Sequence, residues 1–183
     1  MSTEVAIKAT GKISVKPTGI ERPFGEDEII VTKTDLKGRI TYANQVFCRL
    51  AEYSEKELLG QPHSMIRHPE MPRVVFKVLW DAIQDGREVF AYVVNISRNG
   101  GHYWVLAHVT PSFDAQGKIV GYHSNRRKPS SAQVERINGI YRKLREVENT
   151  ASDRKVGLQN SHAFLMDMLK THGVGYDEFI FSI

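Results

Sequence analysis

Cysteine is almost absent from this sequence, because Cys48 is the only one among 183 residues. A single cysteine excludes a disulfide within the chain, which suits a reducing compartment. Long hydrophobic runs are missing as well: no apolar stretch reaches the ~20 residues of a membrane-spanning helix. The first residues, MSTEVAIKATGKISVK, lack the continuous apolar segment of a secretory signal. We therefore expect a cytoplasmic protein without direct membrane insertion.

Motifs of catalysis and metal binding are also lacking. The sequence has no nucleophile motif, no phosphate-binding loop and no paired carboxylates with catalytic spacing, so we do not expect an enzyme. Five of the seven histidines lie between residues 63 and 123, but none of them has the tight spacing of a metal site. We therefore predict no metal ligands.

The excess of positive charge is small, at +4. Part of it is concentrated in residues 126–128 and 136–145. A basic patch can bind phosphates, but this spacing favours a solvated strand end and a solvated helix face. We expect no nucleic-acid partner.

The pattern from residue 25 onward is that of an α+β domain. Two short apolar runs flank the Asp-Leu-Lys-Gly turn of GEDEIIVTKTDLKGRITYAN, which indicates a β-hairpin. Short helices are predicted in residues 44–53, 54–60 and 63–86, the second with a capping box formed by Ser54 and Glu57. Three strands follow, in 88–100, 101–114 and 118–127. This order predicts a five-stranded antiparallel sheet with the short helices on one face.

Both flanks of this domain have a different character. Residues 1–24 mix Lys, Gly, Thr and Pro without a sustained period, so we predict a loosely packed N-terminal arm, a central domain in 25–128 and a C-terminal helical extension in 129–183. In the extension, Val134, Ile137, Tyr141 and Leu144 have the 3, 4, 3 spacing of a helical seam.

The extension continues with a second helix, which should end at Gly173, and with the apolar tail YDEFIFSI. We expect the seam to pack on the sheet, on a second copy of the chain in a homodimer, or on a partner protein. A tail of this composition is also expected to pack rather than to stay in water.

Five segments of the central domain carry a family resemblance: TKTDLKGRITYAN, GQPHSMIRHPEMP, FKVLW, RNGGHYWV and VGYHS. Together they resemble a PAS domain, and the GQPH and RHPEMP boxes are similar to those of bacterial aerotaxis receptors and stand-alone energy-taxis PAS proteins. The resemblance implies the PAS fold, with FAD bound non-covalently between the short helices and the inner face of the sheet. It further implies a redox or oxygen sensor that signals in trans to a membrane chemoreceptor or another signalling protein.

The resemblance also implies site residues, and the chemistry of a flavin agrees with them. A flavin needs a flat apolar slot, amide partners for its pyrimidine edge and cations for its phosphates. Asn95 matches the first Asn of the flavin-binding strands of LOV domains, and it shares a strand face with two small residues. Arg67 and His68 lie in the cofactor-holding box, where a guanidinium suits a diphosphate. Glu70 stands where the family commonly has Asp.

Three further positions match with weaker implications. Trp80 corresponds to the Trp of the family's long helix, which either lines the flavin slot or belongs to the core. Asn44 matches an Asn of the second strand that more often anchors a neighbouring loop. His123 replaces the Gln that follows a Gly in the last strand of LOV domains. The segment PHSMIRHPE lacks the reactive cysteine of those domains, which excludes a light-driven adduct there.

Two other functions stay open on the sequence alone. FMN could take the place of FAD. Alternatively, haem b could bind with one histidine as its axial ligand, which would make the protein a gas sensor. A PAS domain without cofactor could instead serve as a protein-interaction module, because the fold hosts many functions. A visible spectrum separates flavin, haem and an empty pocket.

Overall fold

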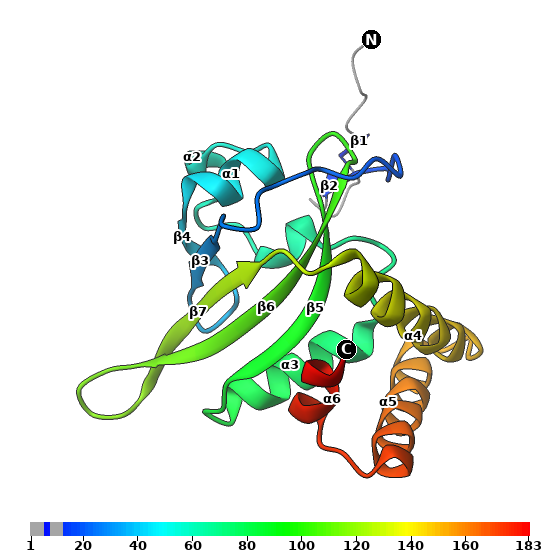
Figure 1. Cartoon of the computed structure of the whole chain (residues 1–183). Coiled ribbons are helices and arrows are strands. Elements are labelled where there is room, and N and C mark those ends of the chain that lie inside the picture. The colour runs from blue at the N-terminus through cyan, green and yellow to red at the C-terminus, as the bar shows by residue number, and fades with distance from the viewer. Residues whose placement is uncertain (1–5, 8–12) are drawn as a thin grey trace.

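The computed structural model describes residues 6–7 and 13–183 (Figure 1). In chain order its elements are β1 (Ala6–Ile7), β2 (Ile13–Ser14), β3 (Ile30–Thr34), β4 (Ile40–Ala43), α1 (Gln45–Ala51), α2 (Glu55–Leu58), η1 (His63–Ile66), α3 (Arg73–Gln84), β5 (Val89–Ile96), β6 (His102–Phe113), β7 (Ile119–Arg127), α4 (Ser131–Asn149), α5 (Arg154–His172) and α6 (Tyr176–Ser182).

A five-stranded antiparallel sheet forms the centre of the molecule. Its strand order is β4-β3-β7-β6-β5, and β1 pairs with β2 in a separate two-stranded sheet. The chain leaves the sheet at one edge, β4, runs through α1, α2, η1 and α3, and returns at the other edge, β5 (Figure 1). The predicted α+β fold, with its sheet and short helices, is confirmed.

Local sequence signals explain where the short helices begin. Asn44 caps α1, since its side chain accepts a hydrogen bond from the backbone N–H of Phe47. Ser54 and Glu57 form the predicted capping box of α2. Pro72 precedes α3 and makes no side-chain cap, so the first N–H groups of that helix need partners from elsewhere in the chain.

The inner face of the sheet makes the main core with the short helices. Alternate residues of a strand point to the same face, and the partners Ala91–Ala107 and Val93–Val105 lie side by side on β5 and β6. The side chains that pack this layer are buried: Ile30, Ala91, Val93, Val105, Ala107, Phe47, Leu50, Ile66, Val74, Val75 and Ile83.

The outer face of the sheet is partly covered by the C-terminal helices. Ile137, Tyr141 and Leu144 of α4 are buried. The Tyr141 hydroxyl donates a 2.6 Å hydrogen bond to the carbonyl oxygen of Tyr92 on β5, and its ring lies 6.1 Å from that of Trp104. Within this chain, Tyr141 of the helical seam lies on the sheet, whereas α4 packs mainly on α5.

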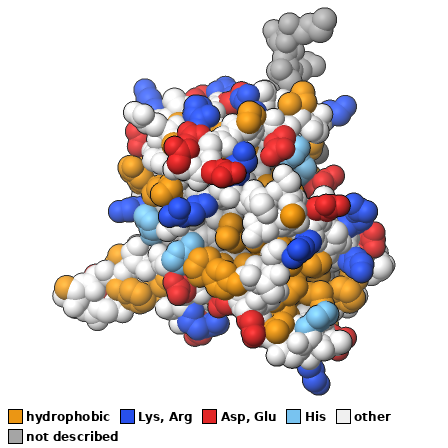
Figure 2. Space-filling view, in the orientation of Figure 1, with side chains coloured by type: hydrophobic (Ala, Val, Ile, Leu, Met, Phe, Trp, Pro, Cys, Tyr) orange, Lys and Arg blue, Asp and Glu red, His pale blue; other side chains and the backbone are white. Residues whose placement is uncertain are grey.

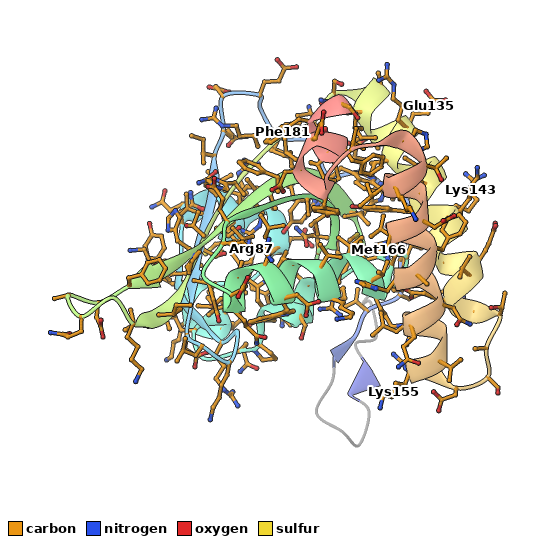
Figure 3. All side chains as sticks on the ribbon, turned by 90° about the horizontal axis from the view of Figure 1, so that it is seen from below. Arg87, Glu135, Lys143, Lys155, Met166 and Phe181 are labelled. Carbon is orange, nitrogen blue, oxygen red and sulfur yellow. The ribbon has the colours of Figure 1, made fainter. Side chains whose placement is uncertain are left out.

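The last two helices pack differently: α5 contacts α4 and α3, and α6 contacts β5. Gly173 ends α5 in the left-handed conformation, with φ 66°, as the sequence predicts. Figure 3 shows α6, which carries Phe181, lying over the strands. The Phe181 ring is 4.7 Å from that of Phe90, and Ile180 is buried. The apolar tail therefore packs as predicted through Ile180, while Phe181 stays 61 % exposed.

The segment before β3 is more tightly bound than its sequence suggests. The N–H groups of Thr18 and Arg22 donate to the carbonyl oxygens of Gly100 and His102, next to the β5–β6 turn. Phe24 is buried with its ring 6.5 Å from Tyr103. The expectation of loose packing is wrong for residues 18–24. For residues 1–5 and 8–12 it lies outside the described part of the chain.

The surface carries mixed charge. Figure 2 shows Lys and Arg side chains interspersed with Asp and Glu on the face drawn, without one continuous basic patch. None of the helices within residues 6–7 and 13–183 combines the length and the apolar character required to cross a membrane.

Candidate functional site

A cavity of about 250 Å³ lies between the inner face of the sheet and the short helices. For comparison, an apolar cavity of roughly 150 Å³ is large enough to admit benzene. Its apolar walls are Phe76, Leu79, Trp80 and Ile83 from α3 and Val93, Ala107 and Val109 from the sheet.

The Trp80 ring closes one side of this cavity. It stands edge-on to Tyr122, with ring centroids 5.5 Å apart. Gly38, in the β3–β4 turn, has φ +73°, and a Cβ there would lie 3.1 Å from Cζ2 of Trp80. A glycine is therefore needed twice over, for the left-handed backbone and for the close approach of the indole.

Several buried polar atoms at the cavity have no hydrogen-bond partner within the protein. Asn95 is 3 % exposed and its Nδ2 is unpaired, as are Nε of Arg67 and Oγ of Ser124. The Arg67 guanidinium lies over the Phe76 ring at 3.5 Å, and burial lowers its pKa. Buried polar groups normally find a partner, either a bound ligand or ordered water.

A second polar cluster joins Arg126, His63 and Thr32. Nη2 of Arg126 donates to Oγ1 of Thr32 at 2.9 Å and to Nε2 of His63 at 2.8 Å. Nη1 of Arg126 has no partner. The guanidinium is 5 % exposed, and burial lowers its pKa to about 10. The interpretation of residues 126–128 as a solvated strand end is therefore wrong for Arg126, although Arg127 is exposed.

The charges around the cavity have one sign. Lys37, Arg67 and Arg126 belong to its lining, whereas no Asp or Glu does among the residues that the structure describes. A buried charge without a counter-ion costs several kcal/mol (roughly 3–5). The cavity is therefore suited to a flat apolar ligand that carries hydrogen-bonding edges and negative charge.

Four of the residues predicted from the sequence belong to the lining of this cavity: Asn95, Arg67, Trp80 and His123. The first two are also neighbours through an isolated backbone bridge between η1 and β5. These positions bring an amide, a guanidinium and an indole to one apolar slot.

His123 borders the cavity, but its strand position directs the side chain elsewhere. It pairs with Lys33 on β3 and alternates with Tyr122 and Ser124, which face inward. Burial lowers its pKa, and the charges of Lys33 and Arg126 and the nearby His108 add to this effect. Ser124 therefore occupies the inward position that the sequence comparison assigned to His123.

The remaining predicted residues lie outside the cavity lining. His68 is buried, and its Nδ1 accepts from the N–H of Glu70, which is itself exposed. Asn44 uses its side chain within the fold: Oδ1 accepts from Val31 and Phe47, and Nδ2 donates to the Ile29 carbonyl oxygen.

Several polar residues of the site were not predicted, among them Thr32, His63, Ser124 and Arg126. Thr32, Ser124 and Arg126 could have been found from the two-residue period of the strands, which places alternate residues on the inner face. On that face Thr32 pairs with Ser124, and Ala107 pairs with Arg126. His63 lies in the GQPH box, whose contact with Arg126 joins residues 63 positions apart. Sequence spacing does not reveal such a contact.

His63 gives the cavity a measurable pH dependence. Burial and the Arg126 guanidinium hold its pKa well below the ordinary 6.5. As the pH falls below about 6.5, the unfolded chain takes up a proton that the folded protein does not, which lowers stability by at most about 1.4 kcal/mol per pH unit. His63→Gln keeps an acceptor for Arg126 and removes the titrating ring.

We expect the unfolding free energy of His63→Gln to fall less steeply than that of the wild type between about pH 6.5 and 5.5, measured by urea denaturation. His68 and His123, whose pKa values are also lowered, remain in both proteins, so the difference isolates His63. Parallel stability curves would show that His63 titrates normally.

Comparisons with known proteins agree with this geometry. Residues 40–126 match the family model described as PAS fold. The aerotaxis receptor of Escherichia coli (strain K12) is 37% identical over 122 residues, which cover 67% of this chain and 24% of the receptor. The nitrogen fixation regulatory protein of Klebsiella pneumoniae is 31% identical over 94 residues, which cover 51% of this chain and 19% of that protein. The chain thus spans about a quarter or less of these relatives.

Solved structures show the same fold. The dark structure of the blue-light photoreceptor Aureochrome1 LOV is 27% identical with a TM-score of 0.52, covering 65% of this chain and 86% of that one. A light-oxygen-voltage domain studied with a flavin analogue has a TM-score of 0.54 at 19% identity, covering 63% and 86%, and it supports the fold alone. The family resemblance indicated by the sequence motifs is confirmed.

Proposed function

This chain contains a PAS domain, and from that premise we propose that its cavity binds a flavin, FAD in the first place, as the sensing group of a redox or oxygen sensor. One observation carries the proposal. Unpaired buried polar atoms of Asn95, Arg67, Ser124 and Arg126 converge on an apolar cavity that has cations and no carboxylate in its described lining.

The residues present fit a flavin in three respects. The walls from α3 and from β5–β6 provide an apolar slot for a flat ring system. Asn95 offers an amide for a pyrimidine edge, and Arg67 and Lys37 offer cations for phosphates. A bound flavin would supply the electron chemistry, whereas the protein supplies binding, orientation and electrostatics.

Redox sensing is favoured over light sensing by the position of the cysteine. Cys48 belongs to α1 and is not part of the cavity lining, and burial raises the pKa of its thiol. A cysteine that forms an adduct would have to touch the ring. The similarity to an aerotaxis receptor points in the same direction as this geometry.

The visible spectrum of the purified protein tests the proposal directly. We expect the two visible bands of a flavin, bleaching on addition of dithionite and recovery in air, because these properties belong to the cofactor. A sharp Soret band would favour a haem-binding gas sensor. A protein that stays colourless after incubation with excess FAD, FMN and haem would favour a cofactor-free interaction module.

Asn95→Ala should weaken flavin binding without unfolding the domain. The substitution removes a buried amide of the cavity lining whose Nδ2 has no hydrogen-bond partner of good geometry among the described residues, with the Tyr103 phenol as its cross-strand neighbour. We expect the dissociation constant for the flavin to rise by about 5- to 150-fold, equivalent to about 1–3 kcal/mol, measured by fluorescence titration. Asn160→Ala, on the exposed side of α5, is the matched control. Equal affinity in both variants would place the flavin elsewhere.

The partner that we propose is a membrane chemoreceptor or another signalling protein acting in trans. The proposal draws on the aerotaxis receptor, whose matched segment is 24% of its length. Mixing the purified PAS protein with candidate receptor fragments and measuring association in the oxidised and reduced states tests it. A redox sensor must bind its partner differently in the two states, so equal association would contradict the proposal.

A further inference from the structure

Arg126 differs from the other charged residues in its surroundings: its guanidinium is held in place by hydrogen bonds, but no negatively charged group among the described residues lies next to it to balance its charge. Its side chain is almost completely buried, and Nη2 is held by Thr32 at 2.9 Å and by His63 at 2.8 Å. Nη1 belongs to the same planar group and has no partner. One end of the guanidinium is therefore anchored, and the other end is buried without a partner in a residue that lines the cavity.

In the part of the chain that the structure describes, none of the groups that contact Arg126 carries negative charge. A histidine nitrogen that accepts a hydrogen bond from an arginine is unprotonated, so His63 is neutral in this arrangement. Thr32 is a neutral hydroxyl, and burial raises the pKa of the nearby Tyr103 phenol, which keeps it neutral as well. The aromatic ring of Phe47, with its centroid 5.8 Å from the guanidinium carbon, offers only a weak cation–π contact.

We infer that Arg126 is the counter-charge for a negatively charged group that the ligand brings into the cavity. The inference rests on the proposed function and makes it more specific. Because its Nη2 is fixed by Thr32 and His63, Arg126 does not have to be ordered when the ligand arrives, which lowers the entropic cost of the contact. Burial also strengthens the attraction, since water screens it less.

Two parts of a flavin could supply this charge. One is the phosphate of FMN or the diphosphate of FAD. The other is the ring itself: when dithionite donates two electrons to the oxidised ring and the ring takes up one proton, it gains one net negative charge. The same guanidinium can bind either anion. A phosphate contact makes Arg126 important for FMN and FAD but not for riboflavin. A ring contact makes it important for the reduced form of the flavin but not for the oxidised form.

The experiment compares wild type, Arg126→Gln and the control Arg127→Gln. Arg127 is the neighbouring residue of β7 and is exposed, so it changes net charge equally without touching the cavity. For each protein, the dissociation constants of riboflavin, FMN and FAD and the reduction potential of the bound flavin are measured. Circular dichroism and urea unfolding verify that the variants are folded.

If Arg126 meets a phosphate, Arg126→Gln weakens FMN and FAD at least about tenfold and leaves riboflavin unchanged. If it meets the reduced ring, the oxidised ligands bind as before, while the reduction potential falls because the reduced form loses at least about tenfold in affinity. Either result supports the inference, and Arg127→Gln should match the wild type.

Unchanged affinities and an unchanged potential in folded Arg126→Gln would overturn the inference while leaving the proposed function intact. A wild type that binds no flavin would instead overturn the proposed function. Should Arg126→Gln fail to fold, the wild type decides: equal affinity for riboflavin and FMN, together with equal affinity for the oxidised and reduced ring, would show that no negative charge is recognised.

Discussion

Glu148→Ala is expected to lower the free energy of unfolding by about 3–5 kcal/mol, one of the largest effects that a single substitution can have here. Glu148 is near the end of α4, and it is 5 % exposed. Its Oε2 accepts from Nε of Arg73 at 3.0 Å, and its Oε1 accepts from the backbone N–H of Val74 at 2.8 Å. The carboxylate thereby caps the first turn of α3.

The size of the effect follows from what the substitution leaves behind. Val74 N–H is one of the helix-start donors that no residue of α3 can satisfy, and Pro72 offers no side-chain cap. Arg73 keeps a second bond to the Arg154 carbonyl oxygen at 2.6 Å but loses its counter-charge. Gly157 packs so closely that a Cβ would collide with the carbonyl oxygen of Glu148, which limits rearrangement.

Urea denaturation of wild type, Glu148→Ala and Glu148→Gln measures this contribution. The amide of Glu148→Gln can still accept from Val74, so its loss should be smaller than that of Glu148→Ala. Glu146→Ala is the control, because Glu146 is an exposed residue of the same helix and should change stability by no more than about 0.5 kcal/mol. Equal small losses at 146 and 148 would show that the buried ion pair contributes nothing.

Much of the fold could be predicted because its signals are local. The hairpin turns, the Ser54 capping box, the Gly173 helix end and the apolar seam of α4 each depend on residues a few positions apart. Such signals agree with one another along the chain, and consistency between local preference and overall fold is typical of foldable sequences.

Contacts between distant residues could not be read in the same way. The α4 seam continues from Leu144 by four residues to Glu148, so its spacing could have indicated a buried carboxylate. The partners of that carboxylate, Arg73 and Val74, are 75 and 74 positions away in the sequence. These contacts tie α3 to α4. The domain boundary that we propose between residues 128 and 129 therefore marks a change in sequence character, whereas the segments on its two sides pack against each other.

The site shows the same division between local and distant information. Motif resemblance identified Asn95, Arg67 and Trp80, which meet at the cavity. Strand register decides the rest: a one-residue step exchanges the two faces of a strand, so Ser124 faces inward while His123 faces outward. Counting along the chain could not establish that register, because the face of each residue is set by its partner strands: His123 pairs with Thr110 on β6 and with Lys33 on β3.

Ala107→Leu is expected to abolish flavin binding while preserving the fold. Ala107 is a buried residue of β6 that lines the cavity, opposite Ala91 on β5 and Arg126 on β7. The isobutyl side chain of leucine extends from the sheet into the cavity of about 250 Å³. It therefore competes for the space that a flat ring requires, at a position where the empty protein has room.

Filling empty space is commonly neutral or stabilising, by up to about 2 kcal/mol, so stability and ligand binding should change in opposite directions. We expect flavin affinity to fall at least about a hundredfold, since the bulk excludes the ring instead of removing one hydrogen bond. Fluorescence titration and urea denaturation of the same samples measure both quantities.

Ala132→Leu, at an exposed position of α4, is the control, because it enlarges a side chain by the same amount without reaching the cavity. Ala107→Leu that bound flavin as tightly as Ala132→Leu would show that the ligand does not occupy this cavity.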